Sequence, residues 1–335
     1  MGKSSFAISS LTVPALLFIT ICLASCKKSD NPIKYKMGTF PDSVIILSDI
    51  NSTYDDYNLN IQQFEGYMPV IFSSNRKSSG GQFDLEQAII WYTFSQTDGS
   101  FNIEATMTND TFFGKLIDKA TTGKNDFGPY RLFSSIDGFE YTIVSSENNN
   151  GNLDLYYLKN QPFYSSSSSV VDGPYPVRLL NTGYDDAYIC FDADLDTVYF
   201  ISNQGGDFDI LLHPKPTGKD ISSWFNLDYE ASVKADSINS TSDDKCPYIH
   251  ENIMVFTSNR PGGLGGYDLY YSLFKNGKWN SPVNFGPGIN TSADEYRPVL
   301  GYDAAFTNLF LMFSSNRSGG KGGFDLYFTG VELSK

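Results

Sequence analysis

Residues 256–269 read FTSNRPGGLGGYDL, and two other stretches repeat this phrase almost letter for letter. They are FSSNRKSSGGQFDL at 72–85 and FSSNRSGGKGGFDL at 313–326. Two weaker copies lie between them, VSSENNNGNLDL at 144–155 and ISNQGGDFDI at 201–210. A phrase that returns about every 55 to 70 residues predicts a repeat architecture built from one supersecondary unit.

Each copy of the phrase predicts a β-hairpin inside a four-stranded unit. In the last unit, a short strand at 295–300 precedes the continuous apolar run at 308–313, which is typical of a strand buried on both faces. The glycines then close a turn, because they tolerate positive φ. A third strand begins at FDL, and a fourth follows it, as at 279–285 in the preceding unit.

A short connector precedes each unit and ends in two acidic residues, as in INTSADE at 289–295, except for a degenerate copy that ends in Asn125 and Asp126. Five connectors and five hairpins predict an all-β, five-bladed β-propeller of four-stranded antiparallel blades. The apolar segment 43–47 precedes the first connector, where a fourth strand belongs. We expect it to pair with the C-terminal blade and close the ring without a long free edge. No convincing helical period is present in this domain.

The N-terminus resembles that of a bacterial lipoprotein. An apolar run at 11–23 is too short to span a membrane, and small residues directly precede Cys26, as in a lipobox. The resemblance implies a signal peptide at 1–25, a lipid on Cys26, a flexible tether at 26–42 and a propeller domain at 43–335. Lysine after the cysteine favours the outer membrane by analogy with enteric bacteria, on either its periplasmic or its surface side. A secretory signal with a coincidental cysteine is the alternative.

The net charge of −14 argues against nucleic acid and anionic lipid surfaces as partners. Cysteine is scarce, so the sequence contains no disulfide framework. Cys190 and Cys246 lie in equivalent strands of successive repeats, and their offset registers argue against a bridge between them without excluding it.

The phrases SNRPGGLGGYDLYYS at 258–272 and KWNSPVNFGPGINTSADEYRP at 278–298 resemble the WD-like β-propeller repeat. This repeat is found in TolB-type periplasmic propellers and in Bacteroidetes OmpA-family envelope lipoproteins. The resemblance covers residues 43–331. It implies a propeller in the cell envelope that holds another envelope protein, as a non-enzymatic scaffold without a cofactor.

Enzyme chemistry has few candidates here. His213 and His250 are the only histidines, and neither has metal-ligand spacing or a place in a Ser-His-Asp pattern. We therefore expect no catalytic residue and no metal site. A structural calcium ion is an alternative, because paired carboxylates beside Asn and Thr oxygens suit hard cations.

The alternative function is a carbohydrate-binding or glycan-cleaving propeller, because glycoside hydrolysis needs only two carboxyl groups. Asp186, Asp244 and Glu295, which open inner strands, are then binding candidates, together with Trp91 in the insertion 87–113. The acids recur in every unit, so capping of turns or pairing with a hairpin arginine competes with this interpretation. A further Asp opens each third strand and is expected to anchor the glycine turn: Asp84, Asp154, Asp209, Asp268 and Asp325.

Overall fold

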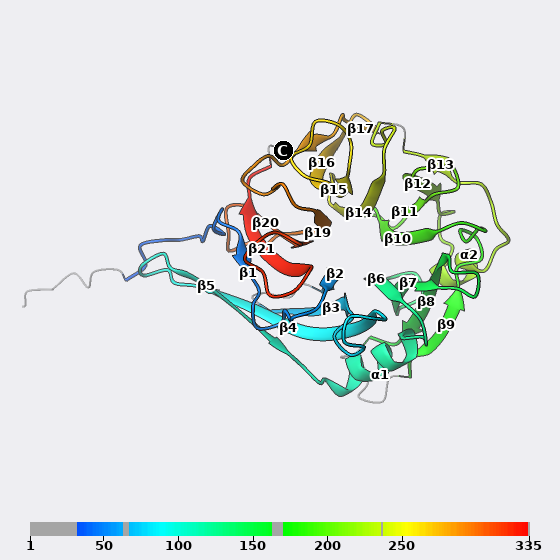
Figure 1. Cartoon of the computed structure of the whole chain (residues 1–335), viewed down its shortest axis with the longest axis horizontal. Coiled ribbons are helices and arrows are strands. Elements are labelled where there is room, and N and C mark those ends of the chain that lie inside the picture. The colour runs from blue at the N-terminus through cyan, green and yellow to red at the C-terminus, as the bar shows by residue number, and fades with distance from the viewer. Residues whose placement is uncertain (1–31, 63–66, 163–169, 236, 334–335) are drawn as a thin grey trace, which may run out of the picture.

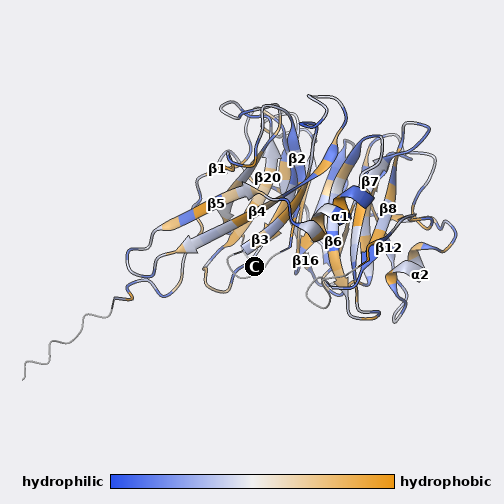
Figure 2. Cartoon of the chain, turned by 90° about the horizontal axis from the view of Figure 1, so that it is seen from below, coloured by the Kyte–Doolittle hydropathy of each residue, from blue (hydrophilic) through white to orange (hydrophobic). Residues whose placement is uncertain are grey.

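The computed structural model describes residues 32–62, 67–162, 170–235 and 237–333, and shows five antiparallel sheets arranged radially about an axis (Figure 1). Seen from the side, the strands run between the two faces of the ring (Figure 2). The predicted all-β, five-bladed propeller of four-stranded blades is confirmed.

The first three blades each contain four strands in chain order, with the first strand nearest the axis. Blade 1 comprises β2 (Asp56–Ile61), β3 (Tyr67–Ser74), β4 (Asp84–Phe94) and β5 (Phe101–Met107). Blade 2 comprises β6 (Asp126–Ser134), β7 (Phe139–Glu147), β8 (Leu153–Asn160) and β9 (Asp172–Pro176). Blade 3 comprises β10 (Asp186–Phe191), β11 (Thr197–Ser202), β12 (Asp209–Pro214) and β13 (Val233–Lys234).

The last two blades depart slightly from this plan. In blade 4, two short outer strands both pair with the third strand. Its strands are β14 (Asp244–His250), β15 (Ile253–Ser258), β16 (Asp268–Lys275), β17 (Lys278–Trp279) and β18 (Val283–Asn284). Blade 5 takes its outer strand from the beginning of the chain. Its strands are β19 (Glu295–Gly301), β20 (Leu309–Ser315), β21 (Asp325–Val331) and β1 (Ile45–Ile46).

The ring closes where the sequence predicted. Strand β1 pairs antiparallel with β21, with Ile45 opposite Phe328 and Ile46 opposite Tyr327. The first and last blades are thereby held together by backbone hydrogen bonds, and the edge of β21 is covered.

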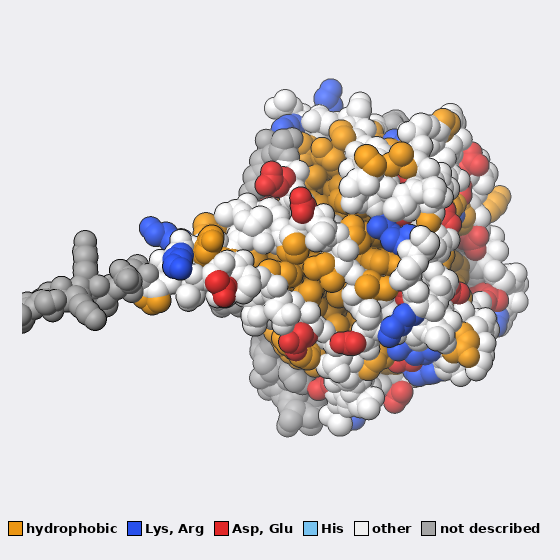
Figure 3. Space-filling view, turned by 60° about the vertical axis from the view of Figure 1, so that its left-hand side comes forward, with side chains coloured by type: hydrophobic (Ala, Val, Ile, Leu, Met, Phe, Trp, Pro, Cys, Tyr) orange, Lys and Arg blue, Asp and Glu red, His pale blue; other side chains and the backbone are white. Residues whose placement is uncertain are grey.

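Residues 34–41 of the expected tether lie against the propeller. Gly38 forms a parallel bridge with Phe306, and the Phe40 ring stacks on the Phe306 ring with centroids 3.8 Å apart. Phe40 is only 1% exposed, because the apolar groups of blades 1 and 5 enclose it. Ile33, directly before this segment, and Tyr35, near its beginning, are about half exposed. Figure 3 shows hydrophobic and basic side chains together on the arm that projects from the propeller. The signal peptide and Cys26 lie outside the described residues.

The second strand of every blade is buried on both faces, as its continuous apolar sequence predicted. All residues of β15 and β20 are buried, and in β11 only Thr197 is partly exposed. These strands fill the space between neighbouring sheets, and their apolar surface supplies most of the burial that stabilises the ring.

The inner strands share a bulge that the sequence did not reveal. In each of them the register shifts after the second residue, and the third residue has a positive φ of 50–59°. A positive φ is uncommon outside glycine, so its recurrence in all five blades marks a built-in feature. The residues concerned are Asn58, Gly128, Tyr188, Cys246 and Arg297.

Two helices interrupt the β pattern, although we expected none. Helix α1 (Thr111–Ala120) begins after Asp110, whose carboxylate accepts the N–H groups of Phe112 and Phe113. It packs Leu116 and Ile117 against the outer part of blades 1 and 2. Helix α2 (Ile221–Phe225) buries Trp224 and Phe225 beside blade 3. Both helices lie between the repeated phrases: α1 follows β5, largely after the predicted insertion 87–113, and α2 lies between β12 and β13.

The connector asparagine binds every blade except blade 2 to the one before it. The Asn290 side chain accepts the N–H of Leu269 at 2.8 Å and donates to the carbonyl oxygen of the same residue at 3.0 Å. It thus pairs with the backbone as a neighbouring strand would. Thr121 stands at this position in blade 2. The same pair recurs at three other boundaries: Asn51 with Leu326, Asn181 with Leu155, and Asn239 with Ile210.

Two hairpin glycines are needed for the close approach of neighbouring blades. A Cβ atom on Gly265 would lie 1.9 Å from the carbonyl oxygen of Ala293, and one on Gly322 would lie 1.9 Å from that of Tyr54. Any side chain at these positions would push the hairpin away from the next connector.

Replacing Asn290 with alanine should destabilise the ring. Asn290 is 1% exposed, so its loss leaves the buried N–H of Leu269 without a partner, whereas the Leu269 carbonyl still accepts the N–H of Phe285. We expect the free energy of unfolding in urea to fall by about 1–3 kcal/mol. Asn150→Ala, in an exposed hairpin, is the matched control and should stay within about 0.5 kcal/mol of the parent. Equal effects of the two substitutions would contradict the role of the connector asparagine.

Candidate functional site

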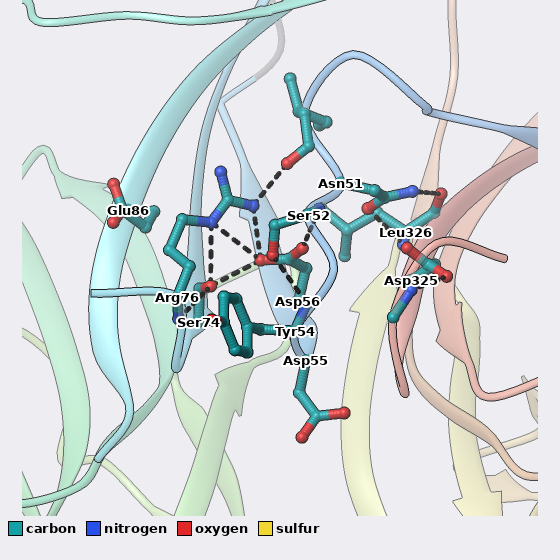
Figure 4. A network of polar contacts seen from close by, with 12 residues as sticks. Asn51, Ser52, Tyr54, Asp55, Asp56, Ser74, Arg76, Glu86, Asp325 and Leu326 are labelled. Carbon is teal, nitrogen blue, oxygen red and sulfur yellow. Dashed lines mark hydrogen bonds and ion pairs between the residues drawn. The ribbon is translucent and has the colours of Figure 1, made fainter. Parts of the chain in front are cut away.

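The first residue of every inner strand is a carboxylate without exposed surface. Each accepts the backbone N–H of the residue four positions earlier, as Asp186 does from Thr182 at 2.6 Å. In blade 1, Asp56 also accepts hydrogen bonds from Ser74 and Arg76, both at 2.5 Å (Figure 4). The five acids are Asp56, Asp126, Asp186, Asp244 and Glu295.

A hairpin arginine completes this network in three blades. Arg76, Arg260 and Arg317 each contact the acid of their own blade and also donate to a connector isoleucine carbonyl, at 2.6–2.8 Å. In blades 2 and 3, Asn148 and Gln204 replace the arginine. The buried acids of these two blades therefore have no hairpin cation.

The pKa values of the buried acids follow the presence or absence of a hairpin arginine only in part. Burial raises the pKa of Asp186 to about 6, and it also raises the pKa of Asp126. Burial raises the pKa of Glu295 too, although Arg317 opposes the shift. A carboxyl group with a pKa near 6 exchanges its proton close to neutral pH, as a general acid must.

The residue before each of these acids accepts a backbone hydrogen bond from the beginning of the third strand of the preceding blade. Asp243 accepts the N–H of Phe208 at 3.1 Å, the hydroxyl of Tyr267 at 2.6 Å, and an ion pair from Lys245 at 3.2 Å. Although burial opposes it, these hydrogen bonds and Lys245 hold the pKa of Asp243 below its usual range. Asp55, Asn125, Asp185 and Asp294 accept the corresponding N–H groups at the other boundaries.

Half-buried aromatic rings gather where these boundaries meet around the axis. Tyr57 contacts the rings of Phe83, Phe127 and Phe324, with centroids 5.0–5.9 Å apart. Tyr296 continues the cluster to Tyr267 at 5.5 Å, and Lys245 lies 4.1 Å from the centroid of Phe208. We call this group the aromatic mouth: Tyr57, Phe83, Phe127, Phe208, Tyr267, Tyr296 and Phe324. It draws residues from all blades around one end of the channel.

The hairpin aspartates lie beneath the glycine turns with differing partners. Asp268 accepts the N–H groups of Leu264 and Gly265, and Asp325 accepts those of Lys321 and Gly322. Asp209 pairs with Lys234, and Asp84 accepts the Gln82 amide. Burial raises the pKa of Asp154, which is half-buried and feels the charge of Asp185.

The structure does not bring the sequence-predicted binding residues into one site. Trp91 lies on β4, where its indole N–H donates to Glu104 at 3.1 Å across the strand pair. Asp186, Asp244 and Glu295 belong to the buried network and have no exposed surface. The aromatic mouth was missed, although its sequence signal exists. In three blades an aromatic residue follows the connector acids, and in four an aromatic residue precedes the hairpin aspartate.

A cavity of about 560 Å³ lies away from the axis, between blades 1 and 2. The insertion 87–113 supplies part of its lining, including Gln87 and Phe113. Behind it, Arg131 forms a buried ion pair with Glu140 at 3.3 Å, and burial lowers the pKa of Arg131 to about 10.

In the described part of the chain, no group of three or more His, Cys, Asp or Glu residues is placed to hold a metal ion. Cys190 and Cys246 are buried free thiols, and burial raises the pKa of Cys246 to about 11. Within the described ranges, no helix has the length and hydropathy to cross a membrane.

Comparison with known proteins finds similarity in solved structures alone. No protein-family model and no curated protein matches the sequence. An endo-arabinase from Bacteroides thetaiotaomicron has a TM-score of 0.50 at 12% identity, covering 90% of this chain and 99% of its own. The catalytic domain of an α-L-arabinofuranosidase from Coprinopsis cinerea scores 0.52 at 12% identity, covering 88% and 98%. An exo-β-1,3-galactanase from Clostridium thermocellum scores 0.52 at 13% identity, covering 87% and 63%.

These comparisons correct the predicted family and function. The similar structures are glycoside hydrolases, so the assignment to WD-like and TolB-type propellers was wrong, and the non-enzymatic protein-binding scaffold inferred from it is withdrawn. The repeated phrase misled because it binds neighbouring blades together, which propellers of any activity require. The scarcity of histidine also does not argue against an enzyme, since glycoside hydrolysis proceeds with carboxyl groups alone.

The raised pKa of Asp186 predicts how stability depends on pH. The folded protein holds this proton more tightly than the unfolded chain, so stability falls as the pH rises from 3.8 to about 6. Asp186→Asn is neutral throughout and escapes this loss. Its free energy of unfolding relative to the parent should therefore increase across that interval by a value on the order of 3 kcal/mol. Its melting temperature relative to the parent should rise accordingly.

Asp244→Asn is the control for this experiment, because Asp244 occupies the same strand position but pairs with Arg260. This variant leaves the arginine unpaired and should melt below the parent at every pH. Parallel melting profiles for Asp186→Asn and the parent would show that burial does not perturb Asp186.

Proposed function

We propose that this protein acts on glycans, and that it binds a saccharide across the aromatic mouth of its channel. The observation that carries the proposal is the cluster of half-buried rings around Tyr57 and Tyr296. Aromatic rings with an accessible face and a polar edge suit the apolar faces and hydroxyl groups of sugars. The carboxylate of Asp243 and the ammonium group of Lys245 lie beside these rings as hydrogen-bonding groups.

Glycosidic bond cleavage is the second candidate, favoured by two observations. The fold is that of solved arabinan- and galactan-degrading enzymes. In addition, the half-buried Asp154 has a raised pKa, whereas that of Asp243 is lowered. Hydrolysis needs one protonated and one ionised carboxyl group, so we assign Asp154 the first role and Asp243 the second, which requires both carboxyl groups to face the same bound saccharide. Asp186 is fully buried, so we assign it no contact with substrate.

Binding can be measured by titrating the protein with oligosaccharides of arabinan and β-1,3-galactan. Tyr57→Ala removes the ring that contacts most others in the mouth and should weaken binding about tenfold, whereas Tyr57→Phe should retain it. Tyr229→Ala, at an exposed position outside the mouth, is the control. Unchanged affinity in a folded Tyr57→Ala protein would place the site elsewhere.

Cleavage can be measured as release of reducing sugar from the same polysaccharides. Asp154→Asn and Asp243→Asn should each lower turnover at least 100-fold, since each removes an acid or a base. Asp154→Asn should leave oligosaccharide affinity within a few-fold, whereas Asp243→Asn also alters a hydrogen-bonding group of the mouth and should weaken binding as well. If the parent binds saccharides without releasing reducing ends, hydrolysis is rejected and glycan binding stands.

We also propose that a lipid on Cys26 anchors the protein to the outer membrane. The small residues before Cys26 and the lysine after it support this location. Cys26→Ser should move the protein from the membrane fraction to the soluble fraction and abolish labelling with a fatty-acid analogue. Retention of the label in the variant would exclude Cys26 as the attachment site.

A further inference from the structure

Arg297 lies at the centre of the propeller with its side chain across the channel. It is the third residue of β19, where the repeated bulge turns residues toward the axis. Its Nη2 atom donates to the carbonyl oxygen of Pro129 in blade 2 at 3.3 Å. Blades 5 and 2 are not neighbours in the ring (Figure 1). The contact with Pro129 therefore requires the guanidinium group to extend across the middle of the channel.

The guanidinium group is fully buried and only partly satisfied. Arg297 has 0% exposure, and its Nε and Nη1 atoms have no hydrogen-bond partner among the described residues. The hairpin arginines are different, because Arg76, Arg260 and Arg317 each contact a carboxylate within 3.0 Å. Arg297 forms no such ion pair in the described part of the chain. Unpaired buried charge is costly, so it calls for a compensating group.

The groups around Arg297 are phenols, thiols and an amide. Its guanidinium carbon lies 5.4 Å from the centroid of the Tyr188 ring, which offers some cation–π attraction. Its charge also acts on Tyr130, Tyr248, Cys190 and Cys246, whose pKa values are raised chiefly by burial. None of these groups ionises near neutral pH in such a setting, so none can neutralise the cation.

One neighbouring acceptor is available, and it carries no charge. Asn58, on the inner strand of the adjacent blade 1, donates its amide N–H to the Tyr188 hydroxyl at 3.1 Å, and its own Oδ1 has no partner among the described residues. A water molecule between Asn58 and Arg297 would satisfy hydrogen bonds but leave the positive charge uncompensated. A monovalent anion would satisfy the N–H donors and the charge together.

We propose that Arg297 binds a small monovalent anion, of the size of chloride, at the centre of the channel. The Nε–H and Nη1–H groups donate to it, and the anion balances the guanidinium charge in a setting that excludes bulk water. The site lies deeper than the aromatic mouth and does not depend on the proposed glycan site. Its role is to stabilise the meeting point of the five inner strands.

The test is thermal unfolding at constant ionic strength while sodium gluconate is replaced by sodium chloride. Chloride should raise the melting temperature progressively, by about 5 °C once its concentration reaches a hundred times Kd. Arg297→Met, which removes the charge and keeps an apolar stem, should abolish the dependence. Arg317→Met is the matched control, because it removes a blade 5 arginine paired with Glu295 and should leave the chloride dependence unchanged.

A second measurement needs no variant. Crystals of the parent protein grown in sodium bromide should show one anomalous peak in contact with Nε and Nη1 of Arg297. A melting temperature that is independent of chloride, together with a water molecule between Arg297 and Asn58 and no bromide, would overturn the proposal. A response to glucuronate but not to chloride or formate would also overturn it, since the site would then take a sugar carboxylate.

Discussion

The pairing of a connector side chain with the backbone of the preceding blade is the interaction on which the ring depends. Neighbouring blades share no strand, so their apolar middles could slide against one another. Asn290 and its counterparts fix the position, because each occupies both backbone groups of one residue in the third strand of the blade before it. A neutral hydrogen bond contributes about 1 kcal/mol to stability, whereas a buried donor or acceptor left without a partner costs more. This difference favours the one arrangement of the blades in which the pair forms.

The rest of the repeated phrase serves the same junction. Gly265 and Gly322 let the hairpin approach the next connector, and the buried acid together with the hairpin arginine of the following blade holds that connector in shape. Carboxylates at the inner strands are therefore engaged in the fold before any are available for chemistry. Blades 2 and 3 lack the arginine, and Asp154 and Asp186, both with raised pKa, lie in these two blades.

The sequence predicted the fold well because the repeat could be counted. Five hairpins and five connectors gave five blades, and the position of Val44–Leu47 before the first connector predicted closure onto β21. Helix α1 escaped prediction because it lies between the repeated phrases. The packing of Phe40 depends on partners such as Phe306, which are distant in sequence. A sequence pattern found by comparing the repeats reveals only those contacts that recur in every blade.

The site was predicted poorly for a related reason. The sequence drew attention to the acids that open the inner strands, and the structure buries them. The bulge that follows these acids turns Arg297 and Tyr188 toward the axis, and a positive φ at non-glycine residues leaves no mark in the sequence. The aromatic mouth needs contributions from all blades, so no single unit displays it. The family resemblance followed the repeated phrase, which reflects the junction between blades rather than the site.

A crystal structure of the protein soaked with an arabinan or β-1,3-galactan oligosaccharide tests the central claim most directly. Our account predicts a sugar ring against Tyr57 or Tyr296, with its hydroxyl groups within hydrogen-bond distance of Asp243 or Lys245. Saccharide found instead in the cavity beside Gln87 and Phe113, with the channel mouth left to solvent, would contradict it.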